Sequence, residues 1–462
     1  MDIKERIFHP NFHSQAEMDE YLQAAHACEP GVDLPLEVAG MSSGITGKNL
    51  VLAATRRRMS AIFGGTAIGL VEHEQEIMEQ PSATSRVKCY QDGNVETMLR
   101  VLDEAREERP FGIIGANFLA AAPDSKRLAE EVCKQGKANE IVMGAGFARW
   151  LPELMARYPK MYYTVISSSM RVTELIWGFG GEHGRKPSRV YYESPIGLFK
   201  GEGAGGHIGA RDKWEAMNRP RPIPTIEELR TSGSAIDWEE VLKRITKDQA
   251  DFDQRKYDPE LFVEQFKQRH PRTPLGFGGG VVYGRDIEML LAMGYDYAAM
   301  GSVPLLSTAS GMPVNLQEEC YLDRSGRYPV DVVDSSPSGI TSRRLRVPED
   351  EQWPETADIV AQTRGKCVKC IGERCRYNKP GGEQNHYCIK EHLIVTQKGQ
   401  KGGVQFAGCV QRVRDDPNFE QVYLDEHGKP RSPDFDTTMD YHVLGKLPVK
   451  QKFRQTEFDF RE

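Results

Sequence analysis

The sequence predicts an α/β protein whose main body is a (β/α)8 barrel. Short apolar runs alternate along the chain with helical stretches of about ten to fifteen residues, which is the order of βαβ units around a parallel sheet. Eight such runs fall within about 270 residues, close to the roughly 250 residues typical of this barrel. A doubly wound open sheet is the alternative interpretation of the same alternation.

The expected strands are short, largely apolar runs, and four of the eight end in glycine or serine. The first, PLEVAGM, is followed by the helical stretch NLVLAATRRRM, and the later runs repeat this order. The expected strands cover residues 35–41, 60–65, 111–118, 139–146, 161–168, 189–195, 274–280 and 297–305. The expected helices cover residues 49–59, 94–108, 125–136, 149–159, 169–180, 259–271 and 285–294.

We expect three parts in the chain: a polar helical lead-in over residues 1–33, the barrel over 34–335, and a cysteine-rich C-terminal extension over 336–462. Residues 211–258 interrupt the barrel after the sixth strand with a long, charged, proline-bearing insertion. Such a loop opens onto the face of the barrel that carries active sites, so it is either a lid or a surface excursion. The polar tail is expected to be irregular and to wrap the barrel or a neighbouring subunit, which leaves a homo-oligomer open.

The composition is that of an ordinary globular protein, with 39% hydrophobic and 27% charged residues and a net charge of −7. Basic and acidic residues are interspersed, which argues against a nucleic-acid partner. No stretch approaches the roughly 20 apolar residues of a membrane span, and the first residues lack the apolar run of a signal peptide. We therefore expect a cytoplasmic protein that acts on a small molecule.

Two glycine-bearing segments predict an anion site. FGGGVVYGRD (277–286) joins the seventh strand to a helix, and MGS (300–302) ends the eighth strand. Exposed backbone amides at such a turn can hold a phosphate, and in (β/α)8 enzymes the loops after strands seven and eight often do so. The candidate residues are Gly279, Gly280, Gly301 and Ser302. Glycine also simply makes turns, which is the alternative.

The segment GEGAGGHIG (201–209) predicts a proton-transfer group in a backbone that can approach a flat ring. Gly205 and Gly206 leave room for close approach, and the imidazole of His207 can take or give a proton near neutral pH. In AGMSSG, Met41 follows Ala39 and Gly40 at the end of the first strand and either packs on a cofactor face or fills core. Asn117, at the end of the third strand, either binds a ligand or caps a turn.

Five of the nine cysteines crowd into one stretch with the spacing C-x2-C-x4-C-x12-C-x20-C, which favours a metal site over disulfides. The expected ligands are Cys367, Cys370, Cys375 and Cys388, with His386 as a substitute. Four thiolates can hold a [4Fe-4S] cluster or Zn²⁺, and free buried thiols are the alternative.

These motifs together resemble those of the nitronate monooxygenases, formerly called 2-nitropropane dioxygenases. PLEVAGMSSGIT resembles the first-strand motif of that family, GEGAGGHIG its Ala-Gly-Gly-His motif, and FGGGVVYGRDIEMLLAMGYDYAAMGS its paired FMN-phosphate loops. SPSGITSRRLR resembles the loop after the barrel, and the cysteine-bearing tail resembles that of members common in anaerobic bacteria. The resemblance covers roughly residues 33–410.

The resemblance implies an FMN-dependent TIM barrel that oxidises alkyl nitronates or a related small acidic substrate. His207 would take a proton from the carbon next to a nitro group or steady the nitronate. The flavin would then take electrons, one at a time in the monooxygenase reaction, and pass them to dioxygen. The resemblance also implies that the main chain of Ala39, Gly40 and Met41 lies against the flavin ring and that Asn117 contacts flavin or substrate. It implies that the FMN phosphate is held by Gly279, Gly280, Gly301 and Ser302. Gly203 and Gly40 depart from the family, which usually has Glu and Pro there, and the loop after His207 is longer.

Three other functions stay open on the same scaffold. The first is an NAD(P)H-dependent reductase of enoyl-thioesters or quinones, which an oxygen-sensitive iron–sulfur cluster would favour. The second is a non-catalytic subunit that binds flavin or an Fe-S cluster inside a larger complex. The third, an enzyme like IMP dehydrogenase, ranks below these because it needs a cysteine in the loop after the sixth strand, and that loop offers His207 and no cysteine.

Overall fold

The computed structural model describes residues 35–57, 59–108, 113–182, 185–198, 203–207, 257–333, 336–338, 341–354, 356–372, 375–382 and 386–445. The predicted lead-in over residues 1–33 lies outside these residues. So does the predicted insertion, of which the structure describes residues 257 and 258. The proposed division of the chain into three parts stays a prediction.

Eight parallel strands form a closed barrel, and each lies where the sequence predicts a strand. The strands are β1 (Leu36–Val38), β2 (Ser60–Gly64), β3 (Ile114–Leu119), β4 (Glu140–Gly144), β5 (Tyr162–Ser167), β6 (Arg189–Glu193), β8 (Leu275–Gly278) and β9 (Tyr297–Met300). They pair in this order, and β9 closes the ring by pairing with β1, where Val38 lies opposite Met300. The predicted (β/α)8 barrel is therefore confirmed, and the doubly wound sheet is excluded.

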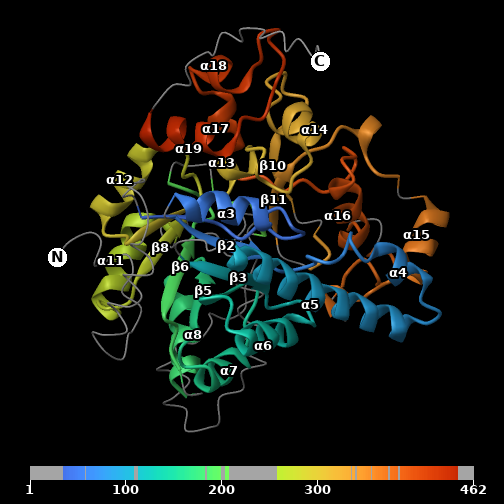
Figure 1. The fold of residues 1–462 in the computed structure, drawn as a ribbon, viewed down its shortest axis with the longest axis horizontal. Coiled ribbons are helices and arrows are strands. Elements are labelled where there is room, and N and C mark those ends of the chain that lie inside the picture. Colours follow the sequence, from blue (N-terminus) through green and yellow to red (C-terminus); the bar gives the residue numbers. More distant parts are fainter. Residues whose placement is uncertain are drawn as a thin grey trace, which may run out of the picture.

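Helices surround the barrel, as the alternating pattern requires (Figure 1). They are α3 (Lys48–Arg56), α4 (Glu74–Glu79), α5 (Ala83–Glu107), α6 (Ser125–Gln135), α7 (Leu151–Arg157), α8 (Met170–Glu182), α11 (Pro259–Arg269), α12 (Gly284–Met293) and α13 (Ser302–Leu305). Most of them bury an apolar stripe against the strands, for example Leu128, Ala129 and Val132 on α6. The helix after β2 is preceded by a long connection, residues 65–73, which becomes one wall of the site described below.

The amino-terminal end of the barrel interior is filled by a buried ionic group. Arg189, the first residue of β6, donates to Glu37 on β1 at 3.0 Å and to Glu140 on β4 at 2.9 Å. Its guanidinium also lies 4.7 Å from the centre of the Tyr297 ring on β9. Burial raises the pKa of Glu37 to about 7, although Arg189 lowers it. This end of the barrel is closed, so a ligand must enter from the opposite, carboxyl end.

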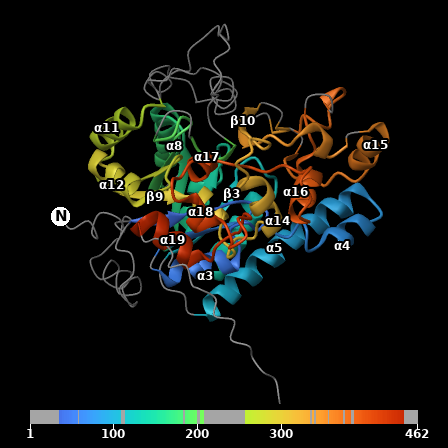
Figure 2. The same cartoon turned by 90° about the horizontal axis from the view of Figure 1, so that it is seen from above.

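The C-terminal part lies against the carboxyl end of the barrel (Figures 1 and 2). The hairpin β10 (Val330–Val333) and β11 (Ser342–Leu345) adds the short strand β7 (Gly206–His207) to make a three-stranded antiparallel sheet. The helical segments are α14 (Val314–Leu316), a π-helix (Gln317–Tyr321), a 3-10 helix (Glu349–Glu351), α15 (Ala357–Gly365), α16 (Ile389–Gln397), α17 (Val410–Arg414), α18 (Phe419–Tyr423) and α19 (Phe435–Leu444). Both views place α15 and α16 beside α4 and α5. Helix α19 contacts α12 and α13, and α17 contacts α13.

The expectation of an irregular tail is wrong for residues 419–423 and 435–444, which form α18 and α19. Asp434 caps α19 by accepting from the Thr437 amide at 2.7 Å. Phe435, Met439 and Val443 then recur every four residues and are buried. This spacing was present in the sequence, where the surrounding polar residues obscured it.

Within the described residues, no helix combines the length and the apolar character needed to cross a membrane.

Candidate active site

A cavity of about 220 Å³ opens at the carboxyl end of the barrel strands. Residues 39–41 after β1, Asn117 on β3, residues 203–207, and the loops after β8 and β9 contribute to its lining. All the residues that the sequence singled out for catalysis and cofactor binding line this one cavity: Ala39, Gly40, Met41, Asn117, Gly205, Gly206, His207, Gly279, Gly280, Gly301 and Ser302. The fold therefore brings together segments that lie up to 263 residues apart in the sequence (302 − 39). Their individual roles remain predictions.

The turn after β8 has a conformation that only glycine adopts without strain. Gly279 and Gly280 have φ values of +111° and +80°. A Cβ at Gly279 would also lie 2.8 Å from the Ala204 nitrogen and from the Ser194 oxygen. At Gly301, by contrast, a Cβ would approach nothing closer than the Met41 sulfur at 3.8 Å. Glycine at 279 thus permits a tight turn in close packing, whereas Gly301 presents bare backbone to open space, which suits a bulky anion.

The end of β1 is held rigidly by short-range hydrogen bonds. Thr46 Oγ1 donates to the Ala39 carbonyl at 2.7 Å and accepts from the Met41 amide at 2.9 Å. Asn117 Nδ2 donates to the Gly40 carbonyl at 3.0 Å, and a Cβ at Gly40 would lie 2.6 Å from Asn117 Cβ. The other amide atom of Asn117, Oδ1, is buried and has no hydrogen-bond partner among the described residues. It is an acceptor placed for a ligand that donates a hydrogen bond.

His207 lies in β7, outside the barrel sheet, and pairs with Ser342 of β11. Its Nε2 lies 2.7 Å from Ser336 Oγ, and its ring lies 5.4 Å from that of Phe406. Burial lowers the pKa of the imidazole to about 4, so the ring is neutral at physiological pH. A neutral imidazole at the edge of a ligand cavity is chemically able to accept a proton.

Glu193 also lines the cavity, and the sequence analysis did not single it out. Burial raises the pKa of its carboxyl group to about 8, against the opposing effect of Arg343, so the group is mostly protonated at neutral pH. Alternation in β6 could have found it, because Arg189, Tyr191 and Glu193 lie two residues apart and the first two also face the barrel interior.

The C-terminal extension supplies a further wall that the motifs did not predict. Phe406, Gly408 and Val410 line the cavity on the side facing residues 203–207. A Cβ at Gly205 would lie 2.6 Å from the carbonyl carbon of Ala407, and one at Gly408 would lie 2.9 Å from Ser302 Oγ. Two backbones therefore cross in direct contact at the mouth of the barrel, which explains why both segments are glycine-rich here.

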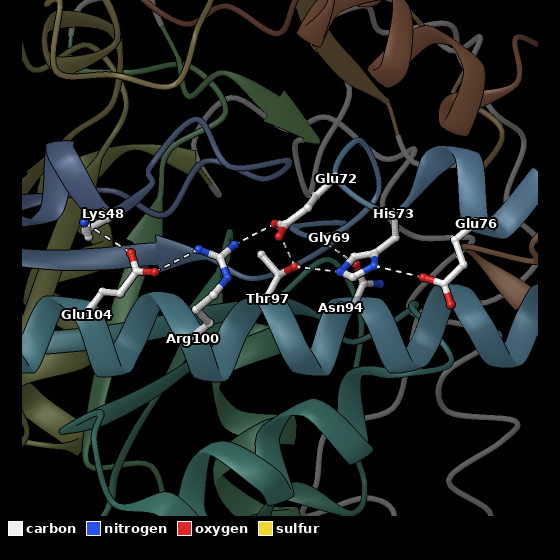
Figure 3. Close-up of polar contacts among 9 residues, drawn as sticks. All are labelled: Lys48, Gly69, Glu72, His73, Glu76, Asn94, Thr97, Arg100 and Glu104. Atoms are coloured by element: carbon white, nitrogen blue, oxygen red, sulfur yellow. Dashed lines mark hydrogen bonds and ion pairs between the residues drawn. The ribbon is translucent and has the colours of Figure 1, made fainter.

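The connection between β2 and α4 forms another wall, through Thr66, Ala67 and Leu70. Figure 3 shows how a row of polar side chains along α5 holds this connection and its neighbours. Asn94 Oδ1 accepts from the Gly69 amide at 3.0 Å, and Thr97 Oγ1 donates to Glu72 at 3.1 Å. Close packing adds to these bonds, since a Cβ at Gly93 would lie 2.8 Å from the His73 ring.

The metal site expected at the cysteines is not supported. The four thiols of Cys367, Cys370, Cys375 and Cys388 are free. Burial raises the pKa of Cys370 well above its usual range, and the nearby Cys388, Cys367 and Cys375 raise it further, so the four lie in one neighbourhood. Yet within the described part of the chain, no group of three or more His, Cys, Asp or Glu side chains is placed to hold a metal ion.

Comparison with known proteins yields likenesses of structure. No family model matches the chain, and no curated protein sequence matches it. FabK from Thermotoga maritima is similar over 86% of this chain and 90% of its own, with a TM-score of 0.51 and 13% identity. The enoyl reductase domain of MlnA, from the macrolactin biosynthesis cluster of Bacillus amyloliquefaciens, is similar over 94% of this chain and 97% of its own. Its TM-score is 0.50 and its identity 12%. Nitroalkane oxidase from Streptomyces ansochromogenes is similar over 82% of this chain and 90% of its own, with a TM-score of 0.48 and 13% identity.

The first two likenesses show the fold that this chain shares with those proteins. The chain is a (β/α)8 barrel whose C-terminal segments cover the carboxyl end of the strands. At this level of identity, activity has to be argued from the site itself.

Proposed function

We propose that the protein is an FMN-dependent oxidoreductase of nitronate monooxygenase type. The observation that supports this best is the convergence of the predicted flavin-contacting residues on one cavity beside His207. The cavity also has the chemical features that FMN requires. The bare loops at Gly279–Gly280 and Gly301–Ser302 suit its phosphate, and the unpaired Asn117 Oδ1 suits a donor on its ring. When bound, FMN supplies the electron acceptor for the substrate.

Three features of this chain would serve the substrate. His207, neutral above about pH 4, would take the proton from the carbon next to the nitro group, because its pKa keeps the lone pair available at neutral pH. Glu193, protonated below about pH 8, would avoid repelling an anionic nitronate. Phe406 and the crossing at Gly205 and Gly408 would exclude water from the reacting atoms.

A second candidate is an NAD(P)H-dependent reductase of enoyl-thioesters. The cavity extends away from the barrel between α5 and α16, where its lining is mostly apolar and includes Leu70, Tyr90, Ile371, Leu393 and Val404. A small nitronate does not need this arm, whereas an acyl chain would. One structural neighbour, the enoyl reductase domain of MlnA, agrees with this alternative.

The deciding experiment is an anaerobic absorption titration of the purified protein, with iron and zinc analysis of the same sample. Flavin bands that bleach with a nitronate alone support the monooxygenase, and bands that bleach rapidly with NAD(P)H support the reductase. Protein that shows no flavin bands even after reconstitution with FMN would refute both.

His207→Asn should leave FMN bound but lower the rate of flavin reduction by a neutral nitroalkane roughly 10²-fold or more, because the proton acceptor is lost. Reduction by the preformed nitronate, which has already lost that proton, should fall much less. His427→Asn is the matched control, since this imidazole is exposed. An unchanged rate in His207→Asn would remove the residue from the mechanism.

A further inference from the structure

His207 is held by three segments that are distant in the sequence. β7 joins β11 through the pairing of His207 with Ser342, and Phe406 lies against the ring. The third contact is polar: Ser336 Oγ lies 2.7 Å from Nε2. Ser336 is fully buried and lies 2.8 Å from Ser338 Oγ, so the ring begins a chain of hydroxyl groups that leads away from the cavity.

The two ring nitrogens have different surroundings. Nε2 bonds to Ser336, whereas Nδ1 has no hydrogen-bond partner in the part of the chain that the structure describes. A neutral imidazole carries its proton on one nitrogen only, and the hydrogen bond to the other nitrogen decides which. The orientation of the hydroxyl chain therefore determines whether Nδ1 meets a ligand as an acceptor or as a donor.

We propose that Ser336, supported by Ser338, holds His207 in the tautomer with the proton on Nε2 and leaves the Nδ1 lone pair for the substrate. Nε2–H then donates to Ser336, and Ser336 donates to Ser338. The opposite direction would leave an N–H group without an acceptor, and orphaned donors in protein interiors are rarer than orphaned acceptors. The use of Nδ1 as a base rests on the proposed function, but the tautomer does not.

Ser336 is thus a positioning residue that acts through His207. Its hydroxyl both accepts and donates a hydrogen bond. When it donates to Ser338, it is therefore left as an acceptor for the proton on Nε2 of His207. The low pKa of His207 agrees with this arrangement, because only the neutral ring has a tautomer to be fixed. The same logic applies wherever a second hydrogen bond orients a catalytic imidazole.

The first test is ¹⁵N NMR of the full-length protein labelled at histidine, with His207→Asn used to assign the signals. We expect His207 to show a protonated Nε2 and a bare Nδ1 at neutral pH. A proton on Nδ1 would overturn the proposal. This readout does not require turnover, so it stays informative even if the protein binds no flavin.

The second test compares Ser336→Ala with Ser336→Thr, which keeps the hydroxyl. We expect Ser336→Ala to mix the two tautomers and to lower kcat for a neutral nitroalkane roughly tenfold, with FMN affinity unchanged, and Ser336→Thr to restore the single tautomer. Ser188→Ala removes another buried hydroxyl far from the cavity and controls for a general loss of stability. A single unchanged tautomer in Ser336→Ala would refute the role of Ser336. A mixed tautomer without any flavin chemistry would uphold it while refuting the proposed function.

Discussion

Glu193 shows how one carboxyl group at the end of a barrel strand can be neutral at physiological pH. It lines the cavity, and burial raises its pKa to about 8, with Arg343 opposing the shift. A protonated carboxyl can donate a hydrogen bond as well as accept one. The site therefore offers a ligand a neutral base at His207 and a neutral acid at Glu193, without a fixed charge on either.

The raised pKa makes stability depend on pH. Between the unfolded value near 4.5 and about 8, the native protein holds a proton on Glu193 that the unfolded chain has released, so stability falls as pH rises. Glu193→Gln cannot titrate, so its stability relative to wild type should increase with pH across this window by up to about 1.4 kcal/mol per pH unit. Urea denaturation of both proteins between about pH 5 and pH 9 measures this difference. Exposed Glu288→Gln is the control, and a difference that does not vary with pH would mean that Glu193 is ionised when folded.

At the scale of single elements, the position of the β2–α4 connection depends on helix α5. Asn94 is fully buried and uses both ends of its amide, accepting from the Gly69 amide at 3.0 Å and donating to Asp124 at 2.7 Å. The row of contacts continues along the exposed side of the helix to Arg100 and Glu104 (Figure 3). The buried hydrogen bonds of Asn94 should contribute much more to stability than the exposed contact between Arg100 and Glu104.

We expect Asn94→Ala to lower the free energy of unfolding by about 2–4 kcal/mol. The change leaves the Gly69 amide and the buried carboxylate of Asp124 without their hydrogen-bond partner. Arg100→Ala, at the exposed end of the row, should cost no more than about 1 kcal/mol. Chemical denaturation gives both values, and hydrogen exchange at the Gly69 amide should speed up only in Asn94→Ala. Equal losses in the two variants would show that burial does not decide the contribution.

The elements also show what the sequence could predict. The eight barrel strands were predictable because most are short, largely apolar runs with a glycine or serine in or beside them, and seven of the eight are followed by a helical period. The sheet formed by β7, β10 and β11 was not, because β7 has two residues and its pairing with Ser342 joins segments 135 residues apart (342 − 207). Glycine motifs located the candidate site, and alternation along β6 could have added Glu193. The wall from Phe406 depends on tertiary packing that no local pattern records.

On the scale of the whole molecule, the C-terminal extension is joined to the glycine turn of the predicted anion site by buried charges. Arg412 on α17 donates to both oxygens of Asp286, at 2.9 and 3.1 Å, and to the Gly280 carbonyl. Asp286 is completely buried at the start of α12 and also accepts from the Val282 and Tyr283 amides. The shape of the glycine turn after β8 thus depends on a residue about 130 positions further along the chain.

Arg412→Ala should therefore damage stability and cofactor binding together. It removes the partner of a fully buried carboxylate, which should cost about 3–5 kcal/mol, and it frees the Gly280 turn, which should weaken FMN binding about tenfold or more. Arg412→Lys keeps the charge but not the bidentate contact with Asp286, so the losses of stability and of FMN affinity should both be intermediate. Denaturation and flavin titration measure them, with Arg346→Ala, an exposed arginine of the same extension, as the control. Loss of stability with unchanged flavin affinity would show that the extension only covers the barrel. Loss of both would show that the proposed phosphate site requires the barrel and its extension to fold as one body, because the turn after β8 belongs to the barrel and is held by Arg412 of the extension.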